Sequence, residues 1–167
     1  LPRTSENVNY DELNKTKKSN MQVKYAYLGQ QFAEVDEYFE DLRELVASGE
    51  FTLGPYVDKF ERKFGDYIGV KHVISTNTGT DALILAFKAS GVKPGDEVIT
   101  VTNTFYATVG AIVAVGAKPV FVDCDDRFQI DANLIEAAIT EKTTAIAPVY
   151  WAGCPPDIEH IVQIANK

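Results

Sequence analysis

The sequence predicts an α/β fold, with a mostly parallel sheet that carries helices on both faces. In the second half of the chain, short apolar or β-branched runs alternate with stretches of helical periodicity. The run from Ala145 to Val149 is continuously apolar, as strands buried on both faces are. Turn residues such as Gly91 to Asp96 separate the elements, and right-handed crossovers then give parallel strands.

Two helices precede the alternating region. Apolar side chains from Gln31 to Ser48 recur at helical spacing, and Gly49 follows where a C-terminal cap belongs. A second helix is expected to begin at Pro55, a residue suited to the first helical position, and to end before Gly69. The strands predicted after it are His72–Thr76, Glu97–Val101, Pro119–Val122 and Thr144–Val149, each followed by a helix: Asp81–Ser90, Tyr106–Val115, Ala132–Ile139 and Asp157–Asn166.

Composition and charge narrow the classes of function. The 167 residues suffice for one folding unit or for a piece of a larger one. A hydrophobic share of 46% without any run long enough to span a bilayer is typical of soluble proteins, so no membrane association is expected. The net charge of −8 comes without a broad basic surface, so nucleic acid is not an expected partner.

The first residues and the cysteines indicate the compartment. Residues 1–24 show neither hydrophobic periodicity nor the apolar centre of a secretory signal, and we interpret them as a polar tail or extension. The two cysteines, Cys124 and Cys154, lack a paired metal-ligand spacing and are expected to be free thiols in a reducing environment. These features predict a cytoplasmic protein.

The loops that follow the strands are where a ligand is expected, because parallel sheets bind ligands at the carboxyl ends of their strands. The loop Asn77–Asp81 passes straight into a helix, so its unpaired amides and the positive end of the helix dipole suit an anion. Gly79 lets a phosphate approach the main chain, and Thr78 and Thr80 add hydroxyl groups. An ordinary capped turn is the alternative, since Asn, Thr and Asp are common capping residues. The loops expected on this rim begin at Asn77, Thr102, Asp123 and Tyr150.

The other loops of the rim carry weaker signals. Phe105 could lie against a flat cofactor, although such aromatic residues more often pack in a core. The loop Asp123–Arg127 gathers carboxylates, but no His or Glu cluster accompanies it, and no metal site is predicted. The loop Tyr150–Pro156 either walls a ligand site or covers the sheet. Neither a dinucleotide fingerprint nor a P-loop is present in the sequence.

A series of short blocks runs along the chain in the order 49–55 (GEFTLGP), 77–83 (NTGTDAL), 94–99 (PGDEVI), 104–108 (TFYAT), 119–123 (PVFVD), 138–140 (AIT) and 148–153 (PVYWAG). In this order and spacing, the blocks resemble those of the DegT/StrS-type sugar aminotransferases, and the likeness covers residues 23–167. That family uses the large domain of the fold type I pyridoxal-phosphate (PLP) enzymes. The resemblance therefore implies that residues 25–167 form the N-terminal portion of this large domain, with an incomplete sheet.

The resemblance implies roles for particular residues. Main-chain amides at Gly79 and Thr80 would hold the cofactor phosphate, in agreement with the anion site expected from the loop itself. An aromatic ring would stack on the pyridine ring and align it for its chemistry. The family often has His where this chain has Tyr150, so no role is assigned to Tyr150. The residues implied to bind PLP are Thr78, Gly79, Thr80 and Phe105, and those implied to border the sugar are Phe51 and Thr52.

The resemblance also implies a reaction. A homodimeric aminotransferase would move an amino group from an amino acid donor such as glutamate to a keto sugar, taken to be nucleotide-linked. The lysine that holds the cofactor and the acidic partner of the pyridine nitrogen are expected beyond the position of Lys167. No catalytic residue is therefore assigned, and the 167-residue chain alone is expected to be inactive.

Two alternatives stay open at this point. One is a sugar dehydratase, a lyase in which His replaces the lysine and pyridoxamine phosphate serves as cofactor. The other is a non-catalytic homologue that binds a sugar or regulates a partner. The residue at the lysine position separates the first alternative from the aminotransferase, and a failure to bind the cofactor would favour the second.

Overall fold

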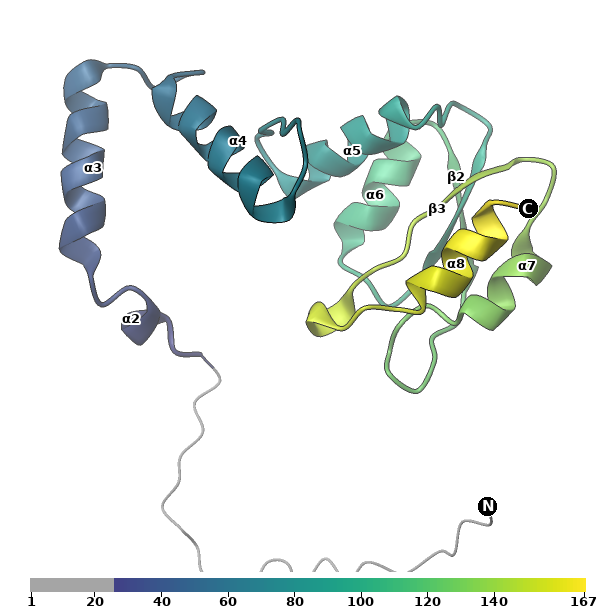
Figure 1. Ribbon diagram of the computed structural model, residues 1–167. Helices are drawn as coiled ribbons and strands as arrows, with labels where there is room; N and C mark the ends of the chain where they lie inside the picture. The colour runs from purple at the N-terminus through teal and green to yellow at the C-terminus, as the bar shows by residue number, and fades with distance from the viewer. Residues whose placement is uncertain (1–25) are drawn as a thin grey trace, which may run out of the picture. The chain divides into compact units, whose positions relative to one another are not determined.

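A computed structural model describes residues 26–167, which fall into two compact units (Figure 1). One unit ends at Lys59 and the other begins at Phe60. The predicted tail, residues 1–24, lies outside the described residues. Within residues 26–167, no helix has both the length and the apolar character that a bilayer crossing requires.

Residues 26–59, the described part of the first unit, contain two helices and the beginning of a third. Helix α2 (Leu28–Gln31) is short, and Glu34 has non-helical angles (φ −91°, ψ 44°), so the next helix, α3 (Val35–Ser48), starts after this break. The single helix predicted from Gln31 is therefore interrupted. Its end is as predicted, because Gly49 adopts φ +69° and its amide donates to the carbonyl of Leu45 at 3.2 Å.

Helix α4 (Pro55–Ile68) begins and ends where the sequence predicts. Pro55 takes its first position, where a missing amide proton costs nothing. Gly69 follows it with φ +73°, and the Val70 amide donates to the Gly65 carbonyl at 3.0 Å, which closes the last turn. The Tyr56 hydroxyl donates to the Glu44 carboxylate at 3.2 Å, so the start of α4 is tied to α3 within the first unit.

The second unit contains a three-stranded sheet in the order β2-β1-β3. Its strands are β1 (Glu97–Val101), β2 (Lys118–Val122) and β3 (Thr143–Ile146). Both pairings are parallel, which confirms the predicted sheet type. β3 ends earlier than predicted, at Ile146, although the Ala147 amide still donates to the Ile99 carbonyl of β1 at 2.8 Å.

Helices cover both faces of this sheet, as predicted (Figure 1). Successive residues of β1 point to opposite faces, so Val98 packs into one core while Ile99 and Val101 pack into the other. All five residues of β1 are buried, which fits a central strand. The first core includes residues of α5 (Gly79–Ala89) and α6 (Tyr106–Ala114), and the second includes residues of η1 (Ala132–Leu134), α7 (Ile135–Ala138) and α8 (Ile158–Ala165).

The predicted strand His72–Thr76 is wrong. These residues form no strand, and the amide of Ser75 donates to the Glu61 carboxylate at 2.7 Å instead of to a neighbouring strand. Ile74, an apolar residue of the run, is 80% exposed. A β-branched run is compatible with an extended backbone, but a strand also needs a partner, and none of the described strands pairs with this segment.

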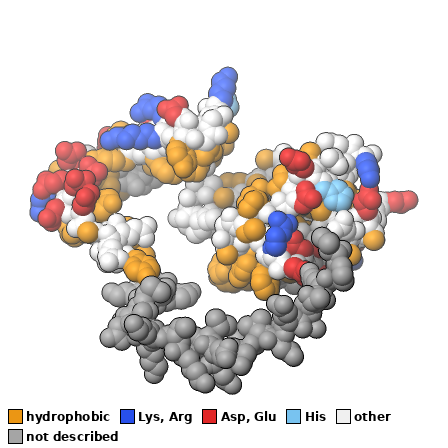
Figure 2. Space-filling view, turned by 60° about the horizontal axis from the view of Figure 1, so that its bottom comes forward, with side chains coloured by type: hydrophobic (Ala, Val, Ile, Leu, Met, Phe, Trp, Pro, Cys, Tyr) orange, Lys and Arg blue, Asp and Glu red, His pale blue; other side chains and the backbone are white. Residues whose placement is uncertain are grey.

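Large apolar side chains remain exposed in both units, and Figure 2 shows them spread over the visible surface. The stripe predicted on α3 is present, but Phe39, Leu42 and Val46 are each about half exposed, at 49%, 50% and 59%. In the second unit, Phe121 on the edge strand β2 is 46% exposed. The sheet is thus open, in keeping with the expected incomplete fold.

Candidate functional site

The start of α5 presents open main-chain amides. Thr78 is extended (φ −143°, ψ 161°), and its hydroxyl accepts the Asp81 amide at 3.1 Å and donates to the Asp81 carboxylate at 2.9 Å. The amides of Gly79 and Thr80 come first in the helix and have no intrahelical carbonyl to bind. A Cβ placed on Gly79 would meet no atom within 4 Å, so the space beside this residue is open. The helix dipole adds partial positive charge at the same point.

A hollow of about 470 Å³ lies at this helix start. It brings together four of the six residues that the sequence singles out, namely Thr78, Gly79, Thr80 and Phe105. The loops that follow β1 and β3 form much of its lining, which is where a parallel sheet is expected to bind a ligand. The rest of the lining consists of Leu83, Thr104, Ala107, Thr108, Val149, Tyr150, Trp151 and Ala152.

Phe105 is available as a ring surface at this hollow. Its side chain is 62% exposed, although it immediately precedes helix α6, one side of which is buried. The ring lies 4.2 Å from that of Tyr106, measured between centroids, and the two planes are tilted by 46°. A side chain that packed in a core would be buried, so the structure leaves Phe105 free to contact a ligand.

Of the eight lining residues that the sequence did not single out, helical spacing could have found two. Leu83 lies one turn after Gly79 on α5, and Thr108 lies one turn after Thr104. The hydroxyls of Thr104 and Thr108 are 2.8 Å apart and hydrogen-bonded to each other. This bond fixes the loop that carries Phe105 to the first turn of α6.

Phe51 and Thr52 are not part of this hollow as described. They lie in the first unit, in the turn between α3 and α4. Both are exposed, Phe51 by 67%, and the neighbouring Leu53 has φ +50°, a left-handed conformation unusual for leucine. Their predicted contact with the sugar stays a prediction.

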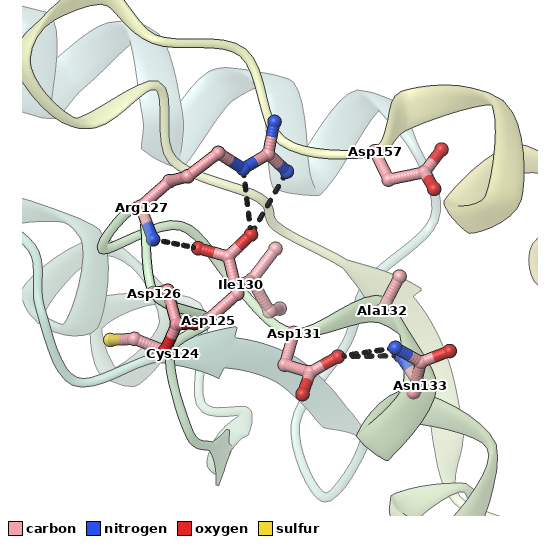
Figure 3. A pocket seen from close by; sticks show the side chains of 9 residues that line it. All are labelled: Cys124, Asp125, Asp126, Arg127, Ile130, Asp131, Ala132, Asn133 and Asp157. Carbon is pink, nitrogen blue, oxygen red and sulfur yellow. Dashed lines mark hydrogen bonds and ion pairs between the residues drawn. The ribbon is translucent and has the colours of Figure 1, made fainter. Parts of the chain in front are cut away.

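The loop after β2 borders a separate cavity of about 340 Å³, shown in Figure 3. Asp125 is the organising residue, since its carboxylate accepts the Arg127 amide at 2.8 Å and the Arg127 side chain at 2.9 and 3.1 Å. Desolvation raises the pKa of Asp125, but hydrogen bonds from Gln129 and Arg127, with the Arg127 charge, lower it overall. The carboxylates here are thus held by the loop itself. Within residues 26–167, no cluster of three or more His, Cys, Asp or Glu is arranged to bind a metal ion.

Comparison with known proteins places this arrangement in a family. The sequence pattern of the DegT/DnrJ/EryC1/StrS aminotransferase family matches residues 33–167. A pleiotropic regulatory protein of Geobacillus stearothermophilus is 46% identical over 88% of this chain and 40% of its own length. The 3-oxo-glucose-6-phosphate:glutamate aminotransferase of Bacillus subtilis is 43% identical over 80% of this chain and 31% of its own.

Further relatives have the same character. The UDP-2-acetamido-2-deoxy-3-oxo-D-glucuronate aminotransferase of Pseudomonas aeruginosa is 43% identical over 79% of this chain and 37% of its own length. The crystal structure of NtdA from Bacillus subtilis with bound cofactor PMP superposes with a TM-score of 0.80 at 38% identity, covering 89% of this chain and 36% of that one. The chain therefore spans 40% or less of each of these four proteins. With the match over residues 33–167, this chain belongs to the DegT/DnrJ/EryC1/StrS aminotransferase family.

Proposed function

We propose that the whole protein is a PLP-dependent aminotransferase that transfers an amino group from an amino acid, glutamate, to a nucleotide-linked keto sugar. The observation that carries the proposal is the hollow that both an open helix start and an exposed aromatic ring line, in a chain of this family. One relative is named for glutamate and a keto sugar phosphate, and another for a UDP-linked keto sugar. We also propose that residues 25–167 are the N-terminal portion of the large domain.

The residues at the hollow fit the chemistry of PLP. Its phosphate needs donors without a competing hydrogen-bond partner, and the amides of Gly79 and Thr80 are such donors. Its flat ring needs an exposed aromatic or apolar surface, which Phe105 offers. The lining of the hollow thus supplies both the donors and the apolar surface that the cofactor needs.

In this proposal the chain's residues bind and orient the cofactor. Thr78 uses its hydroxyl on Asp81, so its contribution is to fix the helix start and the direction of the two free amides. Phe105 restricts rotation of the ring, and the Thr104–Thr108 bond holds Phe105 in place. Leu83 and Val149 line the same hollow with apolar surface and limit the access of water. When bound, PLP would supply an electron sink for the carbon that carries the amino group.

The assembly and the location belong to the same proposal. The family resemblance supports a homodimer. Cys124 and Cys154 are the only cysteines, both are free, and both are partly exposed, which supports a cytoplasmic location.

The proposal is tested on the whole protein with PLP, glutamate and a UDP-linked keto sugar. We expect 2-oxoglutarate and an amino sugar in equal amounts. A dehydrated sugar without an amino product would identify the lyase instead, and a protein that binds neither PLP nor PMP would identify the non-catalytic homologue.

A variant at the helix start ties the activity to this hollow. Gly79→Pro removes one amide proton, and proline suits both the first helical position and the extended Thr78 before it. Losing one charge-assisted hydrogen bond should weaken PLP binding roughly 10- to 100-fold, by titration calorimetry. Gly110→Ala is the matched control, because Gly110 lies in α6 with nothing within 4 Å of an added Cβ, and we expect unchanged binding. Equal affinity of Gly79→Pro and the unmodified protein would contradict this phosphate site.

A further inference from the structure

Gln129 is a buried polar residue for which the proposed reaction has no use. It is 1% exposed, whereas Phe128 beside it is 65% exposed. Burying a carboxamide is costly unless its hydrogen-bonding groups find partners. No buried side-chain nitrogen or oxygen among the described residues lacks such a partner, so Gln129 has a defined set of contacts.

The loop around Asp125 turns Gln129 inward. Asp125 accepts the Gln129 amide at 3.0 Å through its carboxylate, and its own amide donates to the Gln129 carbonyl at 2.8 Å. The same carboxylate holds Arg127, as Figure 3 shows. Phe128, between Arg127 and Gln129 in the sequence, has φ +63°, a left-handed conformation that reverses the chain direction. The cost of this turn is offset by the contacts that Asp125 makes.

The Gln129 carboxamide binds the main chain of Trp151 at both of its polar atoms. The Trp151 amide donates to Gln129 Oε1 at 3.1 Å, and Gln129 Nε2 donates to the Trp151 carbonyl at 3.2 Å. Gln129 Nε2 also donates to the Arg127 carbonyl at 3.0 Å. The side chain therefore links the loop after β2 to the wall of the hollow, because Trp151 is one of its lining residues.

The turn at Trp151 needs support from outside. Ala152 adopts φ +53°, a left-handed conformation that is unfavourable for a residue with a Cβ, and Gly153 follows with φ +78°. Short turn bonds close the segment, from the Gly153 amide to the Tyr150 carbonyl at 3.1 Å and from the Cys154 amide to the Trp151 carbonyl at 3.0 Å. Without the hydrogen bonds from Gln129, an extended backbone at Ala152 would be more favourable, and Trp151 would move.

We propose that Gln129 is a positioning residue of the hollow, which sets the place of the Trp151 wall by holding the Trp151 main chain. That PLP is the ligand of the hollow rests on the proposed function. The hydrogen bonds between Gln129 and Trp151 do not depend on it. Gln129 acts through Trp151 and is not assigned a contact with the cofactor.

Trp151 is the only tryptophan among the 167 residues, so in the whole protein, with any tryptophan outside them replaced by Phe, its fluorescence reports on the wall of the hollow. The variants are Gln129→Met, which keeps a similar volume without hydrogen bonds, and Gln129→Glu, which places a carboxylate against the carbonyls of Arg127 and Trp151. We expect acrylamide to quench Trp151 at least about twofold more strongly in both variants, and most in Gln129→Glu. PLP affinity, measured by quenching of the same tryptophan, should fall about five- to tenfold.

Thr140→Val is the matched control. It removes a 2.7 Å hydrogen bond to the buried Glu97. Glu97 is the first residue of β1 and lies at the opposite end of this strand from the loops that line the hollow. This variant should lose stability while Trp151 quenching stays as in the unmodified chain. Circular dichroism checks that each variant remains folded.

The two proposals fail separately. If Trp151 is as accessible in Gln129→Met and Gln129→Glu as in the unmodified chain, or if Thr140→Val exposes it equally, the positioning role is overturned. If the variants expose Trp151 but PLP binds to none of the proteins, including the whole protein, the positioning role stands and the proposed function fails.

Discussion

Glu97 shows how one residue makes the fold sensitive to acid. Its side chain is largely buried, accepts the Thr140 hydroxyl at 2.7 Å and forms an ion pair with Lys118 at 3.1 Å. The hydrogen bond from Thr140, followed by that from Lys118, lowers the pKa of Glu97 below its ordinary 4.5. Because the pKa is lower in the folded state, the Glu97 carboxylate stabilises the fold at pH values above 4.5. This contribution is lost as the pH falls below 4.5.

Glu97→Gln should remove this acid sensitivity. In urea unfolding at pH 7, we expect the variant to be less stable than the unmodified chain. The difference between their free energies of unfolding should disappear as the pH falls from 4.5 toward 3. Glu136, whose pKa is also lowered by Lys167, titrates in both proteins and cancels in the difference. Glu141→Gln, at an exposed position, is the control. A difference in the free energy of unfolding that persists unchanged to pH 3 would show that Glu97 does not cause the acid sensitivity.

The candidate site shows what residue patterns can and cannot predict. Thr78, Gly79 and Thr80 could be proposed from the sequence because capping and anion binding depend on local sequence, and in the structure they line the same hollow as Phe105. Gln129 could not be recognised, since its partner Trp151 comes from another loop that only the fold brings near. The burial of a loop glutamine leaves no pattern in the sequence.

Individual elements were predictable where their ends carry a chemical signal. Gly49 and Gly69 end helices through positive φ angles, and Pro55 begins one, so these boundaries agree with the sequence. The segment His72–Thr76 has the composition of a strand, yet Ser75 bonds to a helix side chain. Strand formation depends on a partner elsewhere in the chain, and composition alone does not supply one.

The C-terminal end of α3 offers a test at this scale. Gly49→Ala puts a Cβ on a residue with φ +69° that has open space around it, so the cost is conformational, roughly 1 to 2 kcal/mol. Amide exchange in the last turn of α3 should therefore speed up about 5- to 30-fold by NMR. Gly29→Ala is the control, because Gly29 has equal space and no positive φ, and the exchange in α3 should not change. Unaltered exchange in Gly49→Ala would mean that this cap does not hold the helix end.

At the scale of the whole molecule, β1 joins two small cores into one unit. Ile99 and Ile112 are both fully buried, but Ile99 belongs to the core with α7 and α8, and Ile112 to the core with α5 and α6. The overall class was predictable because alternating strands and helices have few compact arrangements. How strongly the two faces depend on each other was not, since that follows from packing on the shared strand.

We expect the two cores of residues 60–167 to unfold together. Ile99→Ala and Ile112→Ala should each lower the free energy of unfolding by about 2 to 5 kcal/mol, because each leaves a cavity beside the same buried strand. Both should shift a single transition of Trp151 fluorescence in urea, as in a two-state domain. Val113→Ala, at a 57% exposed position of α6, should change the stability by less than about 0.5 kcal/mol. A Trp151 transition that moves with Ile99→Ala but not with Ile112→Ala would show that the faces of the sheet unfold independently.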